Sequence, residues 1–404
     1  MNYKETVDYL YSCLPSLDKK GWGAYKPGLS RVNQMLELLG NPQNSYKIIH
    51  VAGTNGKGSV SHMLASILQK TGLKVGLFTS PHLKSFRERI KVNGVEVGEN
   101  EVVSFVKKFS TEAKSISPSF FEYTFALAVN HFKDEDVDVA IIETGLGGRL
   151  DCTNVVRPIL SVITNISLDH EQFLGNTINE VAAEKAGIIK NNIPVVVGRR
   201  QVEVEKVFEK VADSKKSPLY YADVDTVSFL CDLKGNYQVE NQHTVAKCVE
   251  VLNSLTFSIK GSHVVDGFEH VVKNTGLKGR WQQLSNVPKV ICDVGHNLDG
   301  VKELVKQLEN EPSAGIKVVW GMSEDKKIKE ILLLLPKTCR YFWCAADNPR
   351  SLDPNELKKI ASELELDGQV FSSVKEAYKA ALKGLKKEEM VFIGGSVFVV
   401  AEVV

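Results

Sequence analysis

Residues 48–68, IIHVAGTNGKGSVSHMLASIL, place an apolar strand, a glycine-rich loop and a helical pattern in immediate succession. The glycines let backbone N–H groups approach phosphate oxygens, and Lys57 adds a positive charge at a helix N-terminus. The hydroxyl of Ser59 can then bind Mg²⁺. A turn that only reverses the chain is the alternative, but this order of elements favours a phosphate loop. The predicted nucleotide-binding residues of the loop are Gly53, Thr54, Asn55, Gly56, Lys57, Gly58 and Ser59.

Apolar runs alternate with helical patterns around this loop, as in a parallel sheet with helical crossovers. The predicted strands are 46–51, 74–79, 137–143, 159–165 and 193–197, followed by a second series at 289–293, 317–320, 341–344 and 390–393. This α/β pattern predicts a doubly wound, P-loop-type ATPase domain and a smaller, Rossmann-like C-terminal domain. Because NTGLKGR at 274–280 interrupts the periodicity, the predicted domains span 1–279 and 280–404.

Composition narrows the class of protein. The 404 residues are 43% hydrophobic and 25% charged, which is typical of a soluble globular chain. Fifty basic residues nearly balance 49 acidic ones, so nothing favours a nucleic-acid partner. The seven cysteines lack CxxC spacing, the N-terminus lacks a signal-peptide pattern, and no apolar stretch is long enough to cross a membrane. We expect a cytoplasmic protein with no membrane partner.

Two later predicted strands end in candidate metal ligands. Glu143 ends the strand in IIETGLGGRLDCTN, at the edge where open α/β sheets bind ligands. SVITNISLDH repeats the arrangement and ends in Asp169 and His170. A lone histidine is more often structural, but its place after a strand favours a ligand.

The segment TINEVAAEKAGII predicts a short helix that carries Lys185. Thr177 and Glu180 have capping-box spacing, and Gly187 follows as a helix stop. A lysine in the last turn ordinarily complements the helix dipole. The residues alone assign Lys185 no further role.

The loop HVAGTNGKGS departs from the standard GxxxxGK[ST] pattern, since Val51 replaces the first glycine and Gly58 separates lysine from serine. It resembles the ATP loop of the Mur ligase superfamily, and its Gly-Ser ending is similar to that of the folylpolyglutamate synthase and dihydrofolate synthase family. In EKAGI, the resemblance implies that Lys185 is carbamylated and helps to hold a second Mg²⁺. An unmodified ammonium there would repel the metal.

Two further segments resemble the family's folate-binding regions. TSPHLKSFRERIKVNG looks like the loop that closes over a pterin-bearing substrate, although a polar surface turn would explain it alone. SFFEYTFALA supplies aromatic residues. A pterin pocket and a buried helix would explain this pattern nearly equally well. The implied substrate-binding residues are Thr79, Ser80, Pro81, His82, Arg89, Phe121 and Glu122.

GNYQVEN matches the family's GxHQxxN signature, with Tyr237 where histidine is usual. The resemblance implies adenine contacts from Gln238 and Asn241. LKGRWQQ resembles the family's PGR element, with Lys278 in place of proline. The resemblance therefore implies that Arg280 reaches the ATP phosphates.

ICDVGHN corresponds to the family's DGAHN element, with Val294 and Gly295 reversing the order of sizes. The resemblance places Asp293 and His296 near ATP and the incoming glutamate. VFIGGSVFVVAEV resembles the family's C-terminal segment, in which Ser396 would hydrogen-bond the amino-acid substrate.

These motifs together imply an ATP-dependent amide ligase that adds L-glutamate to dihydropteroate, to reduced folate or to both, through an acyl phosphate. Bifunctionality is the chosen expectation, and a monomer is expected from the family. ATP and two Mg²⁺ ions are the expected cofactors. Implied catalytic residues are Lys57, Lys185, His170, Asp293 and His296, and implied metal ligands are Ser59, Glu143, His170 and Lys185.

Two other functions stay open. A cell-wall Mur-type ligase would use the same activation chemistry on a UDP-linked substrate, but only some fifty residues precede the loop, which leaves little room for a UDP-binding domain. A nucleotide-gated binding ATPase would hydrolyse ATP without ligation. Phosphate release that needs neither glutamate nor a folate would favour this second alternative.

Overall fold

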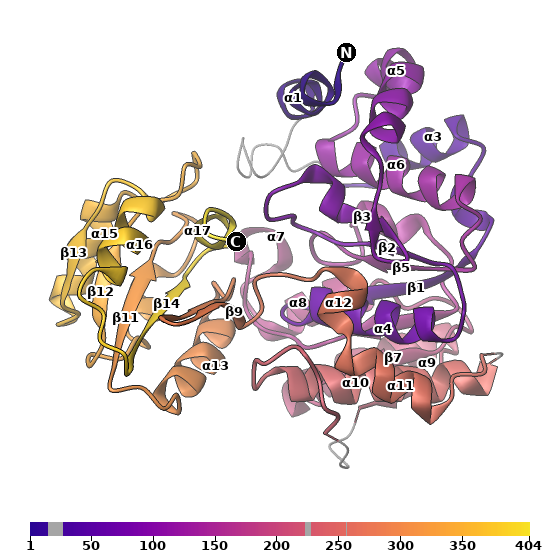
Figure 1. Cartoon of the computed structure of the whole chain (residues 1–404). Coiled ribbons are helices and arrows are strands. Elements are labelled where there is room, and N and C mark those ends of the chain that lie inside the picture. The colour runs from indigo at the N-terminus through magenta and orange to yellow at the C-terminus, as the bar shows by residue number, and fades with distance from the viewer. Residues whose placement is uncertain (15–26, 223–227, 256) are drawn as a thin grey trace. The chain divides into compact units, whose positions relative to one another are not determined.

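The structure, a computed structural model, describes residues 1–14, 27–222, 228–255 and 257–404 (Figure 1). It divides into two compact units, Met1–Asp232 with Gln238–Leu277, and Leu233–Tyr237 with Lys278–Val404. The predicted first domain wrongly included 233–237. This segment packs with the second unit, where the Asn236 N–H donates to Gln307 Oε1 at 2.7 Å and Gln307 Nε2 donates to the Lys234 carbonyl at 3.2 Å.

An eight-stranded sheet forms the centre of the first unit, in the order β4-β3-β2-β5-β1-β6-β7-β8. The parallel strands are β2, β5, β1, β6, β7 and β8. At one edge, β3 pairs antiparallel with β2, and β4 pairs antiparallel with β3. The strands are β1 (Lys47–Ala52), β2 (Val75–Phe78), β3 (Ile90–Val92), β4 (Val95–Glu96), β5 (Val139–Glu143), β6 (Leu160–Ile163), β7 (Val195–Val197) and β8 (Leu219–Tyr221).

Helices cover both faces of this sheet, with α6 and α4 on opposite faces (Figure 1). Every residue of β1 except Lys47 is buried, as expected for a strand covered on both sides. The helices are α1 (Tyr3–Cys13), α3 (Ser30–Leu38), α4 (Lys57–Lys70), α5 (Glu99–Ile116), α6 (Phe120–Asp134), α7 (Glu171–Leu174), α8 (Ile178–Ala186), α9 (Val202–Lys215), α10 (Gln238–Leu255), α11 (Gly261–Glu269) and α12 (Val271–Thr275).

The second unit has a six-stranded sheet in the order β13-β12-β11-β14-β10-β9, parallel except for β9. Large buried rings, among them Trp320, Trp343 and Phe392, fill its core. Its strands are β9 (Gln282–Asn286), β10 (Lys289–Cys292), β11 (Gly315–Trp320), β12 (Arg340–Trp343), β13 (Gly368–Val370) and β14 (Glu389–Gly394). Its helices are α13 (Leu298–Glu309), α14 (Ile328–Leu332), α15 (Pro354–Glu363), α16 (Val374–Leu382) and α17 (Val397–Ala401).

The predicted fold class is confirmed, and all nine predicted strands are present with ends shifted by one or two residues. The sequence prediction missed β3, β4, β8, β9 and β13. All five are edge or near-edge strands, and most have only two or three residues, too few to show a period. No helix among the described residues is long and apolar enough to span a bilayer.

Candidate active site

Segments far apart in the sequence meet at one edge of the first sheet. The neighbouring strands β2, β5, β1 and β6 run parallel, with Val51 opposite Glu143 and Ala52 opposite Ile163. Their carboxyl ends therefore lie together, followed by the 53–56 loop, the 79–82 segment, Glu143 and the 164–170 segment. This is the edge where open α/β sheets bind ligands.

The phosphate loop needs glycine at two positions. Gly53 has φ +147°, and a Cβ there would lie 1.8 Å from Thr164 Oγ1. Gly56 precedes α4 with φ +85°, and a Cβ there would lie 2.3 Å from Asn241 Oδ1. Gly58 falls in the first turn of α4. The glycines thus allow both the loop's backbone conformation and its close packing.

The segment after β6 holds the loop in place. The Thr54 N–H donates to the Asn165 carbonyl at 2.8 Å, and the Asn55 N–H donates to Asn165 Oδ1 at 2.9 Å. Thr164 Oγ1 donates to the Asn55 carbonyl at 2.5 Å, and the Ser167 N–H donates to Thr54 Oγ1 at 3.0 Å. Thr164 and Asn165 were not among the predicted site residues, although they lie in the same SVITNISLDH motif as His170.

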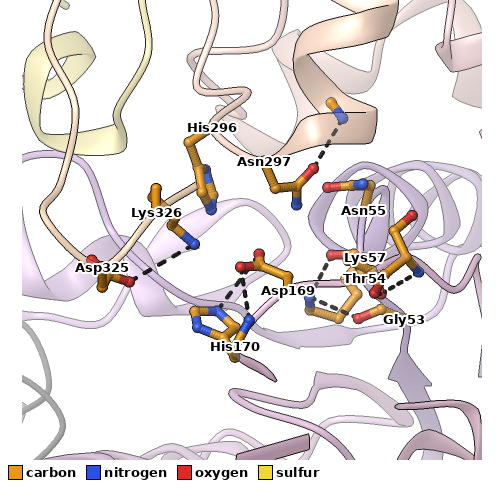
Figure 2. Close-up of polar contacts among 12 residues, drawn as sticks. Gly53, Thr54, Asn55, Lys57, Asp169, His170, His296, Asn297, Asp325 and Lys326 are labelled. Carbon is orange, nitrogen blue, oxygen red and sulfur yellow. Dashed lines mark hydrogen bonds and ion pairs between the residues drawn. The ribbon is translucent and has the colours of Figure 1, made fainter. Parts of the chain in front are cut away.

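Two lysines converge on one carbonyl of the loop. Lys57 Nζ donates to the carbonyls of Gly53 at 3.0 Å and Thr54 at 3.1 Å (Figure 2). Lys185, which is buried, donates from Nζ to the same Gly53 carbonyl at 2.8 Å. Burial, aided by the charge of Lys57, lowers the pKa of Lys185 to about 7. Two amines at one oxygen make this a site suited to anions.

Lys185 lies on the predicted helix, α8, which begins after Thr177 with the expected capping box to Glu180. Gly187 follows the last helical residue, as predicted, with a right-handed φ of −59°. A Cβ at Gly187 would lie 2.4 Å from Arg149 Cα. Glycine is therefore required here for close packing against Arg149.

Glu143 ends β5, whereas His170 lies in the segment after β6, and β1 separates these two strands in the sheet. Glu143 is buried, and its Oε2 accepts a hydrogen bond from the Ser80 N–H at 3.1 Å. His170 has φ +53°, and its N–H donates to Asp169 Oδ1 at 2.9 Å (Figure 2). Within the described ranges, no group of three or more His, Cys, Asp or Glu side chains could hold a metal ion.

Ser59, Gln238 and Asn241 form a buried hydrogen-bonded chain beside the loop. Gln238 Nε2 donates to Ser59 Oγ at 3.2 Å, and Asn241 Nδ2 donates to Gln238 Oε1 at 2.8 Å. All three residues are at most 4% exposed. The first turn of α10 thus packs directly on the start of α4. The proposed roles of Gln238 and Asn241 toward adenine stay predictions.

Asp151, which was not among the predicted site residues, organises the loop after Glu143. Its Oδ2 accepts the N–H groups of Gly145 at 2.9 Å and Leu146 at 2.8 Å, and its Oδ1 accepts Thr153 Oγ1 at 2.5 Å. Burial raises the pKa of Asp151, and these donors oppose that shift. The carboxylate therefore fixes the backbone immediately after the metal-ligand candidate.

The predicted substrate loop is joined to the N-terminal helix. Arg89 Nε donates to His82 Nδ1 at 2.7 Å, so His82 carries its hydrogen on Nε2, which lies 2.9 Å from the hydroxyl of Tyr11 in α1. Tyr11 stacks on Phe120 at 4.7 Å, and the Arg89 guanidinium lies 5.3 Å from that same ring. Burial, with Arg89, lowers the pKa of His82 well below its usual value. Thr79 is buried, whereas Pro81 is exposed.

Phe121 and Glu122 have structural contacts at the start of α6. Phe121 lies 5.6 Å from the Phe78 ring, and a Cβ at Gly145 would lie 2.5 Å from its ring. Glu122 forms the capping box of α6 with Ser119, and its Oε2 pairs with Arg31 Nε at 3.2 Å. A pterin-binding role for either residue stays a prediction.

In the second unit, Asp293 follows β10 and is buried. Its Oδ2 accepts the Trp281 N–H at 2.6 Å and the Tyr237 hydroxyl at 2.5 Å, and its Oδ1 accepts the Gly295 N–H at 2.8 Å. Burial raises the pKa of Asp293, while Tyr237 and Arg280 oppose that shift. Arg280 directly precedes Trp281, so the carboxylate fixes the chain beside this predicted phosphate ligand.

His296 and Ser396 also lie in the second unit. His296 Nδ1 donates to the Val294 carbonyl at 2.9 Å, which in the neutral ring places the lone pair on Nε2. Ser396 precedes the short helix α17, and its hydroxyl accepts the Phe398 N–H at 3.2 Å. The structure therefore gives Ser396 a capping role, and its contact with an amino acid stays a prediction.

Comparison with known proteins identifies both parts of the chain. Residues 51–266 match the model of the Mur ligase middle domain, and residues 279–397 match that of the Mur ligase glutamate ligase domain. The Escherichia coli "Dihydrofolate synthase/folylpolyglutamate synthase" is 33% identical over 390 residues, covering 93% of this chain and 90% of the relative. A Haloferax volcanii relative, "Probable bifunctional folylpolyglutamate synthase/dihydropteroate synthase", is 29% identical; the chain covers 50% of its length.

Solved structures agree with these matches. "E.coli FolC in complex with DHPP and ADP" has a TM-score of 0.87 and 30% identity, covering 100% of this chain and 97% of that one. A bifunctional folylpolyglutamate synthase/dihydrofolate synthase with Mn, AMPPNP and L-glutamate bound has a TM-score of 0.85 and 29% identity, with coverages of 100% and 97%. The chain therefore belongs to the folylpolyglutamate synthase and dihydrofolate synthase family of Mur ligases.

Proposed function

We propose that this chain is an ATP-dependent ligase that forms an amide bond between a pteroate or folate carboxylate and the amino group of L-glutamate. The observation that carries the proposal is the pair of amines, Lys57 and Lys185, that meet at the Gly53 carbonyl beside Glu143's strand end. Relatives with the same fold are described with ADP, AMPPNP, DHPP and L-glutamate bound.

The chemistry explains why ATP is needed. A carboxylate is a poor electrophile because it is negatively charged and lacks a good leaving group. Its attack on the γ-phosphate of ATP gives an acyl phosphate and ADP, and the neutral amine of glutamate then displaces phosphate. Lys57 stabilises charge on the transferred phosphoryl group, and Arg280 is proposed to do the same.

The side chains fit a Mg²⁺ ion that shares its coordination with phosphates. Mg²⁺ prefers oxygen ligands and is usually held by one or two carboxylates together with substrate phosphates and water. Glu143 supplies a buried carboxylate and Ser59 a hydroxyl, while His170 is the less typical donor. Such an ion would neutralise charge that develops on the phosphates. A second ion would need Lys185 to be carbamylated, and its lowered pKa supports that proposal.

In the second unit, we propose that His296 meets the glutamate substrate, since its Nε2 is the ring nitrogen that carries the lone pair. The nitrogen could accept a proton from the attacking amine. For acceptor specificity, the proposal is bifunctional, covering dihydropteroate and reduced folate. We propose a monomer in the cytoplasm.

The test is an ATP-coupled assay that offers dihydropteroate and tetrahydrofolate in parallel, each with and without L-glutamate. We expect ADP release that requires both a pterin acceptor and glutamate, together with a product one glutamate heavier by mass spectrometry. ADP release that needs neither substrate would contradict a ligase. Turnover with only one acceptor would limit the proposal to a monofunctional enzyme.

A further inference from the structure

The Asp293 carboxylate is a junction of hydrogen bonds within the second unit. Asp293 is 2% exposed and accepts the Trp281 N–H, the Gly295 N–H and the Tyr237 hydroxyl at 2.5–2.8 Å. A buried carboxylate is stable only when such donors compensate for lost water. The three donors come from three separate stretches of chain.

Two of these bonds hold backbone beside proposed substrate-binding residues. Trp281 has φ +45°, an uncommon conformation for a residue with a side chain, so its N–H direction needs support from a fixed partner. Arg280 precedes it directly. Gly295, held through its N–H, directly precedes His296. The orientation of the Asp293 carboxylate therefore fixes the backbone that carries the Arg280 and His296 side chains.

The third bond comes from the Tyr237 side chain, whose position is fixed by the residues around it. A Cβ at Gly235 would lie 2.6 Å from two ring atoms of Tyr237, so only glycine leaves room for the ring. The Asn236 N–H is fixed to Gln307 Oε1 at 2.7 Å, and the ring packs against the core cluster of the second unit. The hydroxyl is thereby directed at Asp293 Oδ2.

We propose that Tyr237 is a positioning residue of the ligase, whose hydroxyl orients the Asp293 carboxylate and, through it, the backbone at Arg280 and His296. The inference rests on the proposed function. A tyrosine hydroxyl donates one hydrogen to the carboxylate without adding charge, whereas the histidine usual at this position can also donate but titrates near neutral pH.

The test measures steady-state kinetics of Tyr237→Phe, which keeps the ring and removes the hydroxyl. Loss of a hydrogen bond to a charged group predicts a rise in the KM for ATP of about tenfold or more. The KM for the pterin acceptor should not change, because the residues proposed to bind it lie in the first unit. Tyr237→His, which keeps a donor, should return the KM for ATP to within about threefold of wild type.

Tyr341→Phe is the matched control, since it removes another hydroxyl of the second unit, bonded to the Pro336 carbonyl at 2.7 Å. Its KM values should equal those of wild type. An unchanged KM for ATP in Tyr237→Phe, or an equal loss of kcat with every KM unchanged, would overturn the inference. Should Tyr237→Phe not fold, Tyr237→Met replaces it and the same outcomes apply. Wild-type protein without glutamate-dependent turnover would instead refute the proposed ligase function.

Discussion

The Gly53 carbonyl in the first unit and the Asp293 carboxylate in the second contrast in how their charges are balanced. At Gly53, the amines of Lys57 and Lys185 share one neutral oxygen, and they repel each other. At Asp293, one buried negative charge is met by three donors of its own unit. The first arrangement gathers two cations at a neutral oxygen, whereas the second pairs an anion with donors of its own unit.

The difference separates side chains that are expected to bind ligands from side chains that hold the backbone. Cations that meet at one neutral oxygen gain from a bound phosphate, so their removal should reduce activity more than stability. A buried carboxylate that holds backbone N–H groups of its own unit should, when removed, reduce stability as well as activity. Three substitutions test this contrast, and a fourth tests the predicted substrate loop.

The largest effect is expected for Lys57→Ala. Without this ammonium, stabilisation of the transferred phosphoryl group is lost, and kcat should fall by on the order of 10³-fold. The free energy of unfolding should change by less than about 1 kcal/mol, because Lys57 only bonds loop carbonyls and repels Lys185. The measurements are ADP release and urea unfolding. Lys70→Ala, at the other end of α4, is the control and should retain full activity.

Asp293→Ala, unlike Lys57→Ala, should reduce stability strongly. It leaves the buried N–H groups of Trp281 and Gly295 without their acceptor, so we expect a loss of about 3 kcal/mol in the free energy of unfolding. Asp299→Ala is the control, since its exposed ion pair with Lys302 should contribute less than about 1 kcal/mol. A similar small loss in both variants would remove the contrast between the two units.

Replacement of Lys185 by alanine should lower kcat by on the order of 10²-fold, because the carbamate proposed to hold a metal cannot form. Only a neutral amine reacts with CO₂. With a pKa of about 7, the Lys185 amine is about one-tenth neutral at pH 6 and about nine-tenths neutral at pH 8. Bicarbonate should therefore raise the activity of the wild-type protein faster at pH 8.

Native mass spectrometry provides a second measure of this prediction. Wild-type protein should carry the mass of one added CO₂, and Lys185→Ala should not. Lys190→Ala is the control, because Lys190 is another lysine with a lowered pKa, of about 8. Its replacement should leave the adduct on Lys185 in place. Wild-type protein without the adduct, together with activity indifferent to bicarbonate, would contradict carbamylation.

Tyr11→Phe is expected to have the smallest effect. It removes the hydroxyl that lies 2.9 Å from His82 Nε2 but keeps the stacking on Phe120. One neutral hydrogen bond predicts a rise of about threefold to tenfold in the KM for the pterin acceptor, with the KM for ATP unchanged. Tyr46→Phe is the control, since its hydroxyl bonds the Val129 carbonyl in α6, away from the 79–82 segment.

Local signals predicted much of the fold. The strand ending at Glu143 and the helix beginning after Thr177 could be read from apolar runs and a capping box. The two-residue strand β4 could not, since it has no measurable period. The 233–237 segment was assigned to the wrong unit because its partner, Gln307, lies about seventy residues away and leaves no local pattern.

The site shows the same limit. Order along a parallel sheet was enough to expect Lys57, Glu143 and His170 at one edge. The supporting contacts of Asn165 with Asn55 and of Tyr11 with His82 join residues 110 and 71 positions apart. Such pairs depend on how the chain folds back, which neither spacing nor composition records.

The return of Leu233–Tyr237 to the second unit means that the protein cannot be divided by one cut. A fragment that starts at Lys278 would lack Tyr237, leaving the Asp293 side chain short of a donor. Transplanting the glutamate ligase region between relatives would likewise require two stretches of sequence to move together. Modularity here is a property of the folded chain, not of its linear order.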